Sequence, residues 1–158
     1  MKARTLASVL SIVSLASCGG NKPVEISPDA QSLATRWNGT LSAPPELAGV
    51  EDVRGQAWMA GDQKEQGQTR AHVEISNAVP GGRHPWHVHR GQCGKDEGVF
   101  GPADAYQPLE VADNGKASQT ALLPVALPHE GSYFVNVHAS SRNMGTIVAC
   151  GNLAPPAR

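Results

Sequence analysis

The stretch Arg83-His84-Pro85-Trp86-His87-Val88-His89 alternates between apolar side chains and histidines over its last four positions. Successive side chains of a β-strand point to opposite faces of the sheet. The alternation therefore predicts a strand with Trp86 and Val88 on one face and His87 and His89 on the other. Because the apolar face should pack into a core, we expect the two histidines to project outward, near the surface of the fold.

Two histidines at positions i and i+2 of a strand can hold one metal ion, although such a pair more often lies at a solvated strand edge. A third histidine favours the metal site. In the predicted strand 132–139, His138 has the parity opposite to Val135 and Val137 and so points away from the aliphatic face. We expect His87, His89 and His138 to converge on one side of the fold, where imidazole nitrogens suit copper or another borderline metal.

The remaining histidines receive different interpretations. His84 has the parity of Trp86, so we expect it to be buried and hydrogen-bonded behind the site and not to be a ligand. His72 alternates with aliphatic residues and is interpreted as a solvated strand residue. His129 lies between a proline and Glu130-Gly131, which is typical of a turn.

The rest of the chain is rich in turns, with 17 Gly and 12 Pro and only 4% aromatic residues among 158. No segment shows a sustained helical period, and short alternating segments recur between turn signals. The candidate strands are 35–42, 54–60, 69–77, 84–90, 107–112, 117–125, 132–139 and 146–150. Eight short strands predict an all-β fold, an antiparallel sandwich or barrel.

The N-terminus resembles a secretory signal. Lys2 and Arg4 precede an apolar stretch, Leu6–Leu15, which is too short to span a bilayer and ends in small residues before Cys18. A cysteine at that position is typical of a bacterial lipoprotein signal, so we expect residues 1–18 to be a signal with a lipidated Cys18. The alternative is an ordinary signal peptide with an incidental cysteine.

These features predict a protein that crosses the inner membrane and is lipid-anchored in the cell envelope, facing the periplasm. Residues 19–33 then form a flexible tether, and residues 34–158 form one domain. Removal of Lys2 and Arg4 from the 13 basic residues, against 14 acidic ones, gives a mature net charge of about −3. The absence of a basic patch argues against a nucleic-acid partner. No feature of the sequence specifies an oligomeric state.

Cys93 and Cys150 are the two cysteines left when Cys18 is lipidated. An even number of cysteines in an oxidising compartment favours a disulfide bond between them. The alternative is a pair of free thiols near the histidines, where they would be soft metal ligands.

Several segments together resemble the copper/zinc superoxide dismutases. His84–His89 is similar to that family's His-Gly-Phe-His-Val-His segment, and Gly145–Gly151 is similar to its C-terminal Gly-Ser-Arg-Leu-Ala-Cys-Gly. Cys93 resembles the first disulfide cysteine of the bacterial members. Gly101-Pro102 resembles the start of their zinc-binding loop, and Val137-His138 resembles the segment with the last copper ligand.

The resemblance covers roughly residues 34–153 and implies an eight-stranded Greek-key β-barrel. It implies that His87, His89 and His138 are copper ligands and that His84 supports them from behind. It also implies the disulfide between Cys93 and Cys150. A chordin-type β domain can carry a His-x-His pair as well, but the Ala-Cys-Gly ending together with Cys93 argues against it.

The chain departs from that family at its second metal. Ala103 stands where the histidine that bridges copper and zinc is expected, and the other zinc ligands have no counterpart in 103–111. We therefore expect no zinc at that position. The arginine that guides superoxide maps to Ile147, and Arg83, Arg90 and Arg142 are the candidates for a substitute charge.

Three functions remain open at this point. The first is a divergent, lipoprotein-type superoxide dismutase that uses copper alone and converts superoxide to dioxygen and hydrogen peroxide. The second is a lipoprotein that binds, buffers or delivers copper with little dismutase activity, which the missing histidine and arginine favour. The third is a metal-free structural or adhesion sandwich in which the histidines are incidental.

Overall fold

A computed structural model describes residues 35–47, 49–50 and 52–156. The predicted signal 1–18 with Cys18, and the tether 19–33, lie outside the described residues. Ten strands and two short 3-10 helices make up the regular structure of the described part. Within that part, no helix has both the length and the apolar character needed to cross a membrane.

Eight strands form one antiparallel sheet in the order β6-β5-β9-β10-β1-β2-β3-β8, and β4 and β7 form a second, two-stranded sheet. The strands of the large sheet are β1 (Trp37–Ser42), β2 (Arg54–Gly61), β3 (Thr69–Ser76), β5 (Trp86–Gln92), β6 (Lys95–Val99), β8 (Ala117–Leu123), β9 (Tyr133–Ser140) and β10 (Asn143–Leu153). The small sheet pairs β4 (Arg83–His84) with β7 (Leu109–Glu110). The prediction of an all-β antiparallel barrel or sandwich is confirmed.

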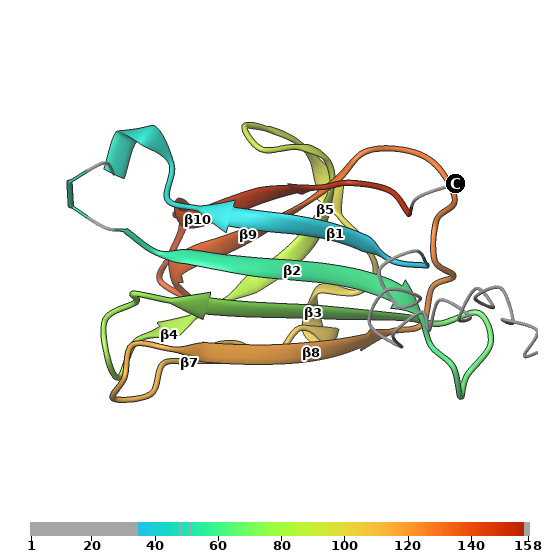
Figure 1. Ribbon diagram of the computed structural model, residues 1–158, viewed down its shortest axis with the longest axis horizontal. Coiled ribbons are helices and arrows are strands. Elements are labelled where there is room, and N and C mark those ends of the chain that lie inside the picture. The colour runs from blue at the N-terminus through green and yellow to red at the C-terminus, as the bar shows by residue number, and fades with distance from the viewer. Residues whose placement is uncertain (1–34, 48, 51, 157–158) are drawn as a thin grey trace, which may run out of the picture.

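The large sheet curls into a half-barrel, so that β5 lies behind β1, β2 and β3 in Figure 1. Strands far apart in the sequence become neighbours: β5 pairs with β9, and β1 pairs with β10. The connections from β3 to β4 and from β8 to β9 therefore cross between strands that are not adjacent, as Greek-key connections do. This topology brings the predicted histidines of β5 and β9 together.

The inner faces of the curled sheet enclose one hydrophobic core. Trp86, Val88, Val135 and Val137 are buried there, as the alternation of their strands predicts. Phe134 is also fully buried, yet it does not belong to that core cluster. Its place on the outer face of β9 indicates that a second layer covers this part of the sheet.

Two predicted strands differ from the structure. The expected strand 84–90 is divided at Pro85 into β4 and β5, because proline offers no backbone N–H to a ladder. The expected strand 107–112 shortens to β7, and β6 was not predicted at all. Strand β6 consists of Lys95-Asp96-Glu97-Gly98-Val99, whose three charges and glycine hide the strand signal, and it lies at an edge of the sheet.

Candidate metal centre

Strand β5 places His87 and His89 on the face that turns away from the core, as predicted. That face is not open to solvent, however, since His89 is only 5% exposed and its ring stacks on Phe134 with the centroids 5.1 Å apart. The expectation of a site near the surface is therefore wrong for His89. Strand β6 pairs beside β5 in the same sheet, and the end of this hairpin crosses β9 to the disulfide with β10 and places Asp96 against His89. The sequence pattern does not reveal that cover.

Strand β9 contributes His138, which is buried on the same outer face. Its backbone N–H donates to the carbonyl of Pro85, 2.8 Å away, and this bond fixes the end of β9 against the start of β5. The ring of His138 lies 5.5 Å from that of His87 and 6.2 Å from that of His89. One nitrogen of each histidine lies within 4.8 Å of the corresponding nitrogen of the other two.

The hydrogen bonds of His89 identify which nitrogen is free. Its Nδ1 lies 2.9 Å from Oδ1 of Asp96, and a carboxylate oxygen only accepts hydrogen bonds. Nδ1 therefore carries the hydrogen and donates it. The Nε2 atom of His89 is buried and has no hydrogen-bond partner in the described residues. Such an unpartnered acceptor is costly in a folded protein unless a ligand satisfies it.

His138 is arranged in the same way, with a different partner. Its Nδ1 donates to the backbone carbonyl of Met144 at 2.7 Å, which leaves Nε2 unprotonated. Strand β10 pairs irregularly with β9 between Asn143 and Ile147, and a bulge of this kind redirects backbone groups. The bulge explains how the backbone carbonyl of Met144 points toward the ring of His138 instead of pairing regularly with β9.

Two of the nitrogens lie at a separation that suits one metal ion. Nδ1 of His87 and Nε2 of His138 are 3.4 Å apart and share a long hydrogen bond, which a bound metal ion would replace. Two nitrogens bound to the same ion at about 2.0 Å lie about 2.8 to 3.5 Å from each other, depending on the coordination geometry. The three histidines therefore fit a metal through Nδ1 of His87 and Nε2 of His89 and His138.

The electrostatic environment keeps two of these imidazoles neutral. Burial, followed by repulsion from the neighbouring His138 and His89, lowers the pKa of His87 from 6.5 to about 4. Burial also lowers the pKa of His138. A neutral imidazole is the form that binds metal, so protons compete only weakly for these two ligands near neutral pH.

His84 lies behind the ligands, as predicted. It is buried, and its Nδ1 donates to the backbone carbonyl of His138 at 3.0 Å. Its Nε2 faces Gly82, where an added Cβ would come within 2.8 Å of that nitrogen. This Nε2 is also buried without a hydrogen-bond partner among the described residues, but His84 does not belong to the group of three converging histidines. His84 thus supports the backbone of His138.

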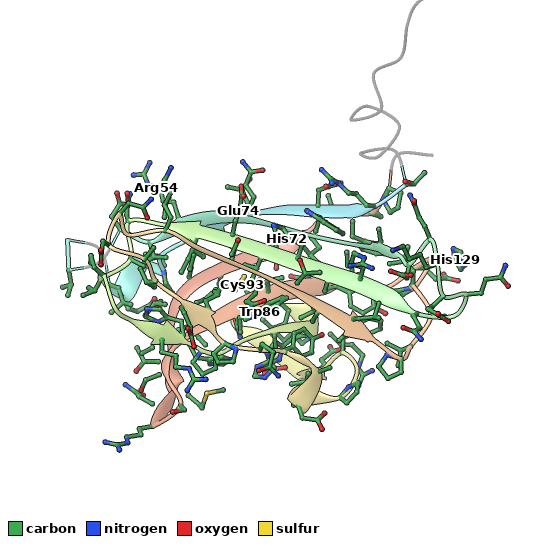
Figure 2. All side chains as sticks on the ribbon, turned by 90° about the horizontal axis from the view of Figure 1, so that it is seen from below. Arg54, His72, Glu74, Trp86, Cys93 and His129 are labelled. Carbon is green, nitrogen blue, oxygen red and sulfur yellow. A yellow bond between two sulfur atoms is a disulfide. The ribbon has the colours of Figure 1, made fainter. Side chains whose placement is uncertain are left out.

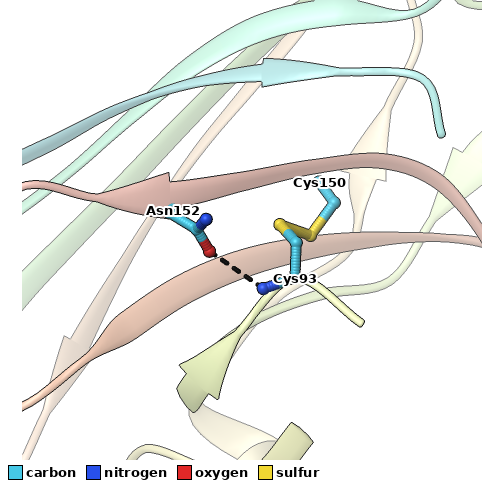
Figure 3. The surroundings of a disulfide bond; sticks show 3 residues. All are labelled: Cys93, Cys150 and Asn152. Carbon is cyan, nitrogen blue, oxygen red and sulfur yellow. Dashed lines mark hydrogen bonds between the residues drawn. A yellow bond between two sulfur atoms is a disulfide. The ribbon is translucent and has the colours of Figure 1, made fainter. Parts of the chain in front are cut away.

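The two cysteines form the predicted disulfide, and Cys93 and Cys150 have their Cα atoms 6.1 Å apart. Figure 3 shows the bond joining the β5–β6 hairpin to β10, beside a hydrogen bond from the backbone N–H of Cys93 to Oδ1 of Asn152 (2.8 Å). The alternative of two free thiols as metal ligands is excluded by this bond. The candidate donor set is therefore nitrogen alone.

A cavity of about 800 Å³ adjoins the centre and is lined by His138, Asp96 and Met144, among others. Among the described residues, its lining includes two carboxylates, Glu46 and Asp96, and no lysine or arginine. Ile147 also lines it. The cavity therefore offers a small molecule or ion a route to His138 with a negative electrostatic bias.

The other residues considered from the sequence lie elsewhere. His72 is half-buried on β3, where it stacks on Trp58 with the centroids 5.3 Å apart and bonds to Oγ1 of Thr120 at 2.9 Å. It is less solvated than expected. His129 is exposed at one end of the molecule, away from Cys93 in Figure 2. Ala103 begins a 3-10 turn and has no side-chain ligand atom.

Two partners of the ligands were missed from the sequence. Asp96 lies seven residues after His89, in a charged segment that resembles a solvated turn. Met144 acts through its backbone carbonyl, for which no side-chain pattern exists. The only available signal was the position of Asp96 close to both His89 and Cys93.

A scan of protein-family models finds no match to this chain, and a search of curated proteins also finds none. The function is therefore inferred from the residues and geometry of the centre itself.

Proposed function

We propose that this protein is a divergent, copper-dependent member of the superoxide dismutase family, with a mononuclear centre formed by His87, His89 and His138. The observation that carries the proposal is the convergence of three imidazole nitrogens with a buried, unpartnered Nε2 on His89. Three nitrogen ligands suit Cu(I), and Cu(II) leads the affinity order of the divalent first-row metals. The resemblance of the two ligand-bearing segments to the copper/zinc enzymes supports the choice of copper.

Bound copper would supply reversible one-electron chemistry at this position. That chemistry would convert two superoxide anions and two protons into one dioxygen and one hydrogen peroxide. The chain holds His89 and His138 in fixed tautomers, through Asp96 and the carbonyl of Met144. With Ala103 in place of a bridging histidine, water would have to supply the protons.

The cellular setting belongs to the same proposal. A lipidated Cys18 and a tether over 19–33 would hold the domain in the cell envelope, facing the periplasm. Superoxide is then the small-molecule substrate, and the membrane is contacted through the lipid. The disulfide is consistent with an oxidising compartment.

A second function, binding and transfer of copper with little turnover, is favoured by the charge of the adjoining cavity. Its two carboxylates attract a cation and repel the superoxide anion, whereas dismutation gains rate from positive steering. Two of the three candidate substitutes for the guiding arginine, Arg83 and Arg90, are engaged elsewhere. Arg83 lies 3.5 Å from Glu110, and Arg90 donates to the carbonyl of Val99 at 3.1 Å.

The experiment that decides is the rate of superoxide decay per bound copper, in the purified protein and in the His138→Ala variant. His72→Ala is the matched control, since it removes a strand histidine outside the centre. Fast decay that tracks copper and is lost only in His138→Ala supports the dismutase. Tight copper binding with decay equal to that of His138→Ala supports copper binding and transfer. Retention of no copper would leave only the metal-free sandwich.

A further inference from the structure

The carboxylate of Asp96 has an unusual position for an acidic residue on an exposed edge strand. Its Oδ1 accepts one hydrogen bond from Nδ1 of His89 at 2.9 Å and another from the backbone N–H of Gly98 at 2.7 Å. Gly98 has a φ of +104°, a conformation that favours glycine and directs its N–H toward the carboxylate. The hairpin is thus shaped around this oxygen.

The hairpin that carries Asp96 is also held firmly from outside. Cys93, three residues earlier, is bonded to Cys150 of β10, and its N–H donates to Asn152. Gly91 lies at an irregular step of the β5–β6 ladder with a φ of +100°, and its N–H donates to the carbonyl of Ser132 at 2.9 Å. These ties fix the position of Asp96 relative to β9 and β10, and therefore relative to the centre.

The three ligand histidines differ in what lies on their second nitrogen. His89 has a carboxylate, His138 has a neutral carbonyl, and His87 has no partner for its Nε2 among the hydrogen bonds of the described residues. A carboxylate on Nδ1–H makes an imidazole a stronger donor than a carbonyl does. Among the described residues, Asp96 is also the only negatively charged residue that is hydrogen-bonded to one of the three histidines.

We infer that Asp96 is a positioning residue that holds Nε2 of His89 toward the copper and favours Cu(II) over Cu(I) through its charge. The inference rests on the proposed copper centre and deepens it. A negative charge near the metal stabilises the dication more than the monocation. Asp96 therefore lowers the reduction potential of the centre. Its carboxylate places a negative charge beside the copper through His89.

The first test uses the metal-free protein, so that it does not depend on copper. Nitrogen-15 NMR of the imidazoles should show His89 protonated at Nδ1 in the wild type and in Asp96→Asn, whose amide oxygen can still accept. In Asp96→Ala the tautomers should mix. Protonation of His89 at Nε2 in the wild type, or an unchanged tautomer in Asp96→Ala, would overturn the positioning role.

The second test measures the dissociation constants of Cu(II) and Cu(I) separately. Asp96→Ala should weaken Cu(II) binding about 10- to 100-fold, as loss of a partner to a ligand typically does. Asp96→Asn should weaken Cu(II) more than Cu(I), and each tenfold change in that ratio raises the one-electron potential by about 59 mV. Glu97→Gln removes the same charge from the neighbouring exposed residue and should leave both constants unchanged.

These outcomes separate the inference from the function on which it rests. A wild type that binds copper, with Asp96→Asn indistinguishable from Glu97→Gln, would overturn the role of the charge and leave the copper centre intact. A wild type that binds no copper would overturn the proposed function and the redox part of the inference together. The tautomer of His89 in the metal-free protein would still decide the positioning part.

Discussion

The outer face of β3 and the outer face of β5 carry histidines in the same local pattern but in different surroundings. His72 alternates with core residues just as His89 does, and each has a hydrogen-bond partner on Nδ1. On β3 that partner is a threonine of the next strand, and within the described part of the chain no further histidine or acid completes a metal-binding group there. On β5 the partner is a carboxylate from the β5–β6 hairpin.

The difference shows that strand parity determines only the face on which a histidine lies. The covering segments supply the hydrogen-bond partners that turn such a histidine into part of a candidate metal site. Over β5 and β9, two hairpins supply acceptors for Nδ1 and leave Nε2 of both His89 and His138 unprotonated. On β3 the ring of His72 stacks on the ring of Trp58. Burial lowers the pKa of His72 as well as that of His87, so a lowered pKa alone does not distinguish the two faces.

The largest change is expected from removing the tie that holds the second layer in place. The double variant Cys93→Ser, Cys150→Ser should lower the free energy of unfolding by about 4 kcal/mol, the chain-entropy value for a loop of this length. Urea unfolding measures the loss, with the wild type in reductant as the companion sample. Unchanged stability would mean that the hairpin holds without the bond.

Removal of one histidine of the candidate metal centre should leave the outer face of β5 with as little affinity for copper as the outer face of β3. Loss of a residue that only supports a metal ligand typically weakens metal binding by up to about 100-fold. Because His89→Ala removes a ligand itself, it should weaken copper binding by more than that. Competition with a chelator of known affinity measures the constant. His72→Ala should bind copper as the wild type does, and an equal loss in both variants would contradict the assignment of the site.

Acid should act on the metal centre of the folded chain through its neutral histidines. The pKa of His87 is about 4 when folded and 6.5 when unfolded, so the unfolded chain binds more protons between these values. Stability of the metal-free protein should therefore fall as the pH drops from 6.5 to 4, and this contribution should be constant above 6.5. Urea unfolding at several pH values should give a shallower slope for His87→Gln, whereas His129→Gln, at the exposed turn, should keep the wild-type slope.

The smallest effect is expected on the face without a second layer. His72→Ala removes one cross-strand pair with Thr120 and the stacking on Trp58, and should cost about 0.2 to 1 kcal/mol of stability. Thermal unfolding measures it. A loss of several kcal/mol would show that β3 depends on this histidine far more than a surface pair allows.

The sequence predicts the parts of the centre that depend on local periodicity. The opposite faces of Trp86 and His87 follow from the two-residue repeat of a strand, and so does the orientation of His138. The buried role of His84 was also predicted, although Pro85 breaks the strand between it and His87. His84 and Trp86 are nevertheless both buried, as their shared parity predicts.

What the sequence did not predict comes from contacts between layers. The cover over His89 depends on β6, whose charged residues resemble a loop. The acceptor for His138 is a backbone carbonyl placed by a bulge, and any residue type supplies a carbonyl. Such contacts become visible only when β9, β10 and the β5–β6 hairpin are seen together.

The pairing of β5 with β9 also sets an order of events during biosynthesis. His87 and His89 are separated along the chain from His138, and the bond between Cys93 and Cys150 involves the last strand. Contacts this distant in sequence form late and slowly in folding. No metal ion can be held by all three histidines until the chain has been synthesised past His138 and β9 has paired with β5, so retention of a metal ion would report on the formation of this long-range pairing.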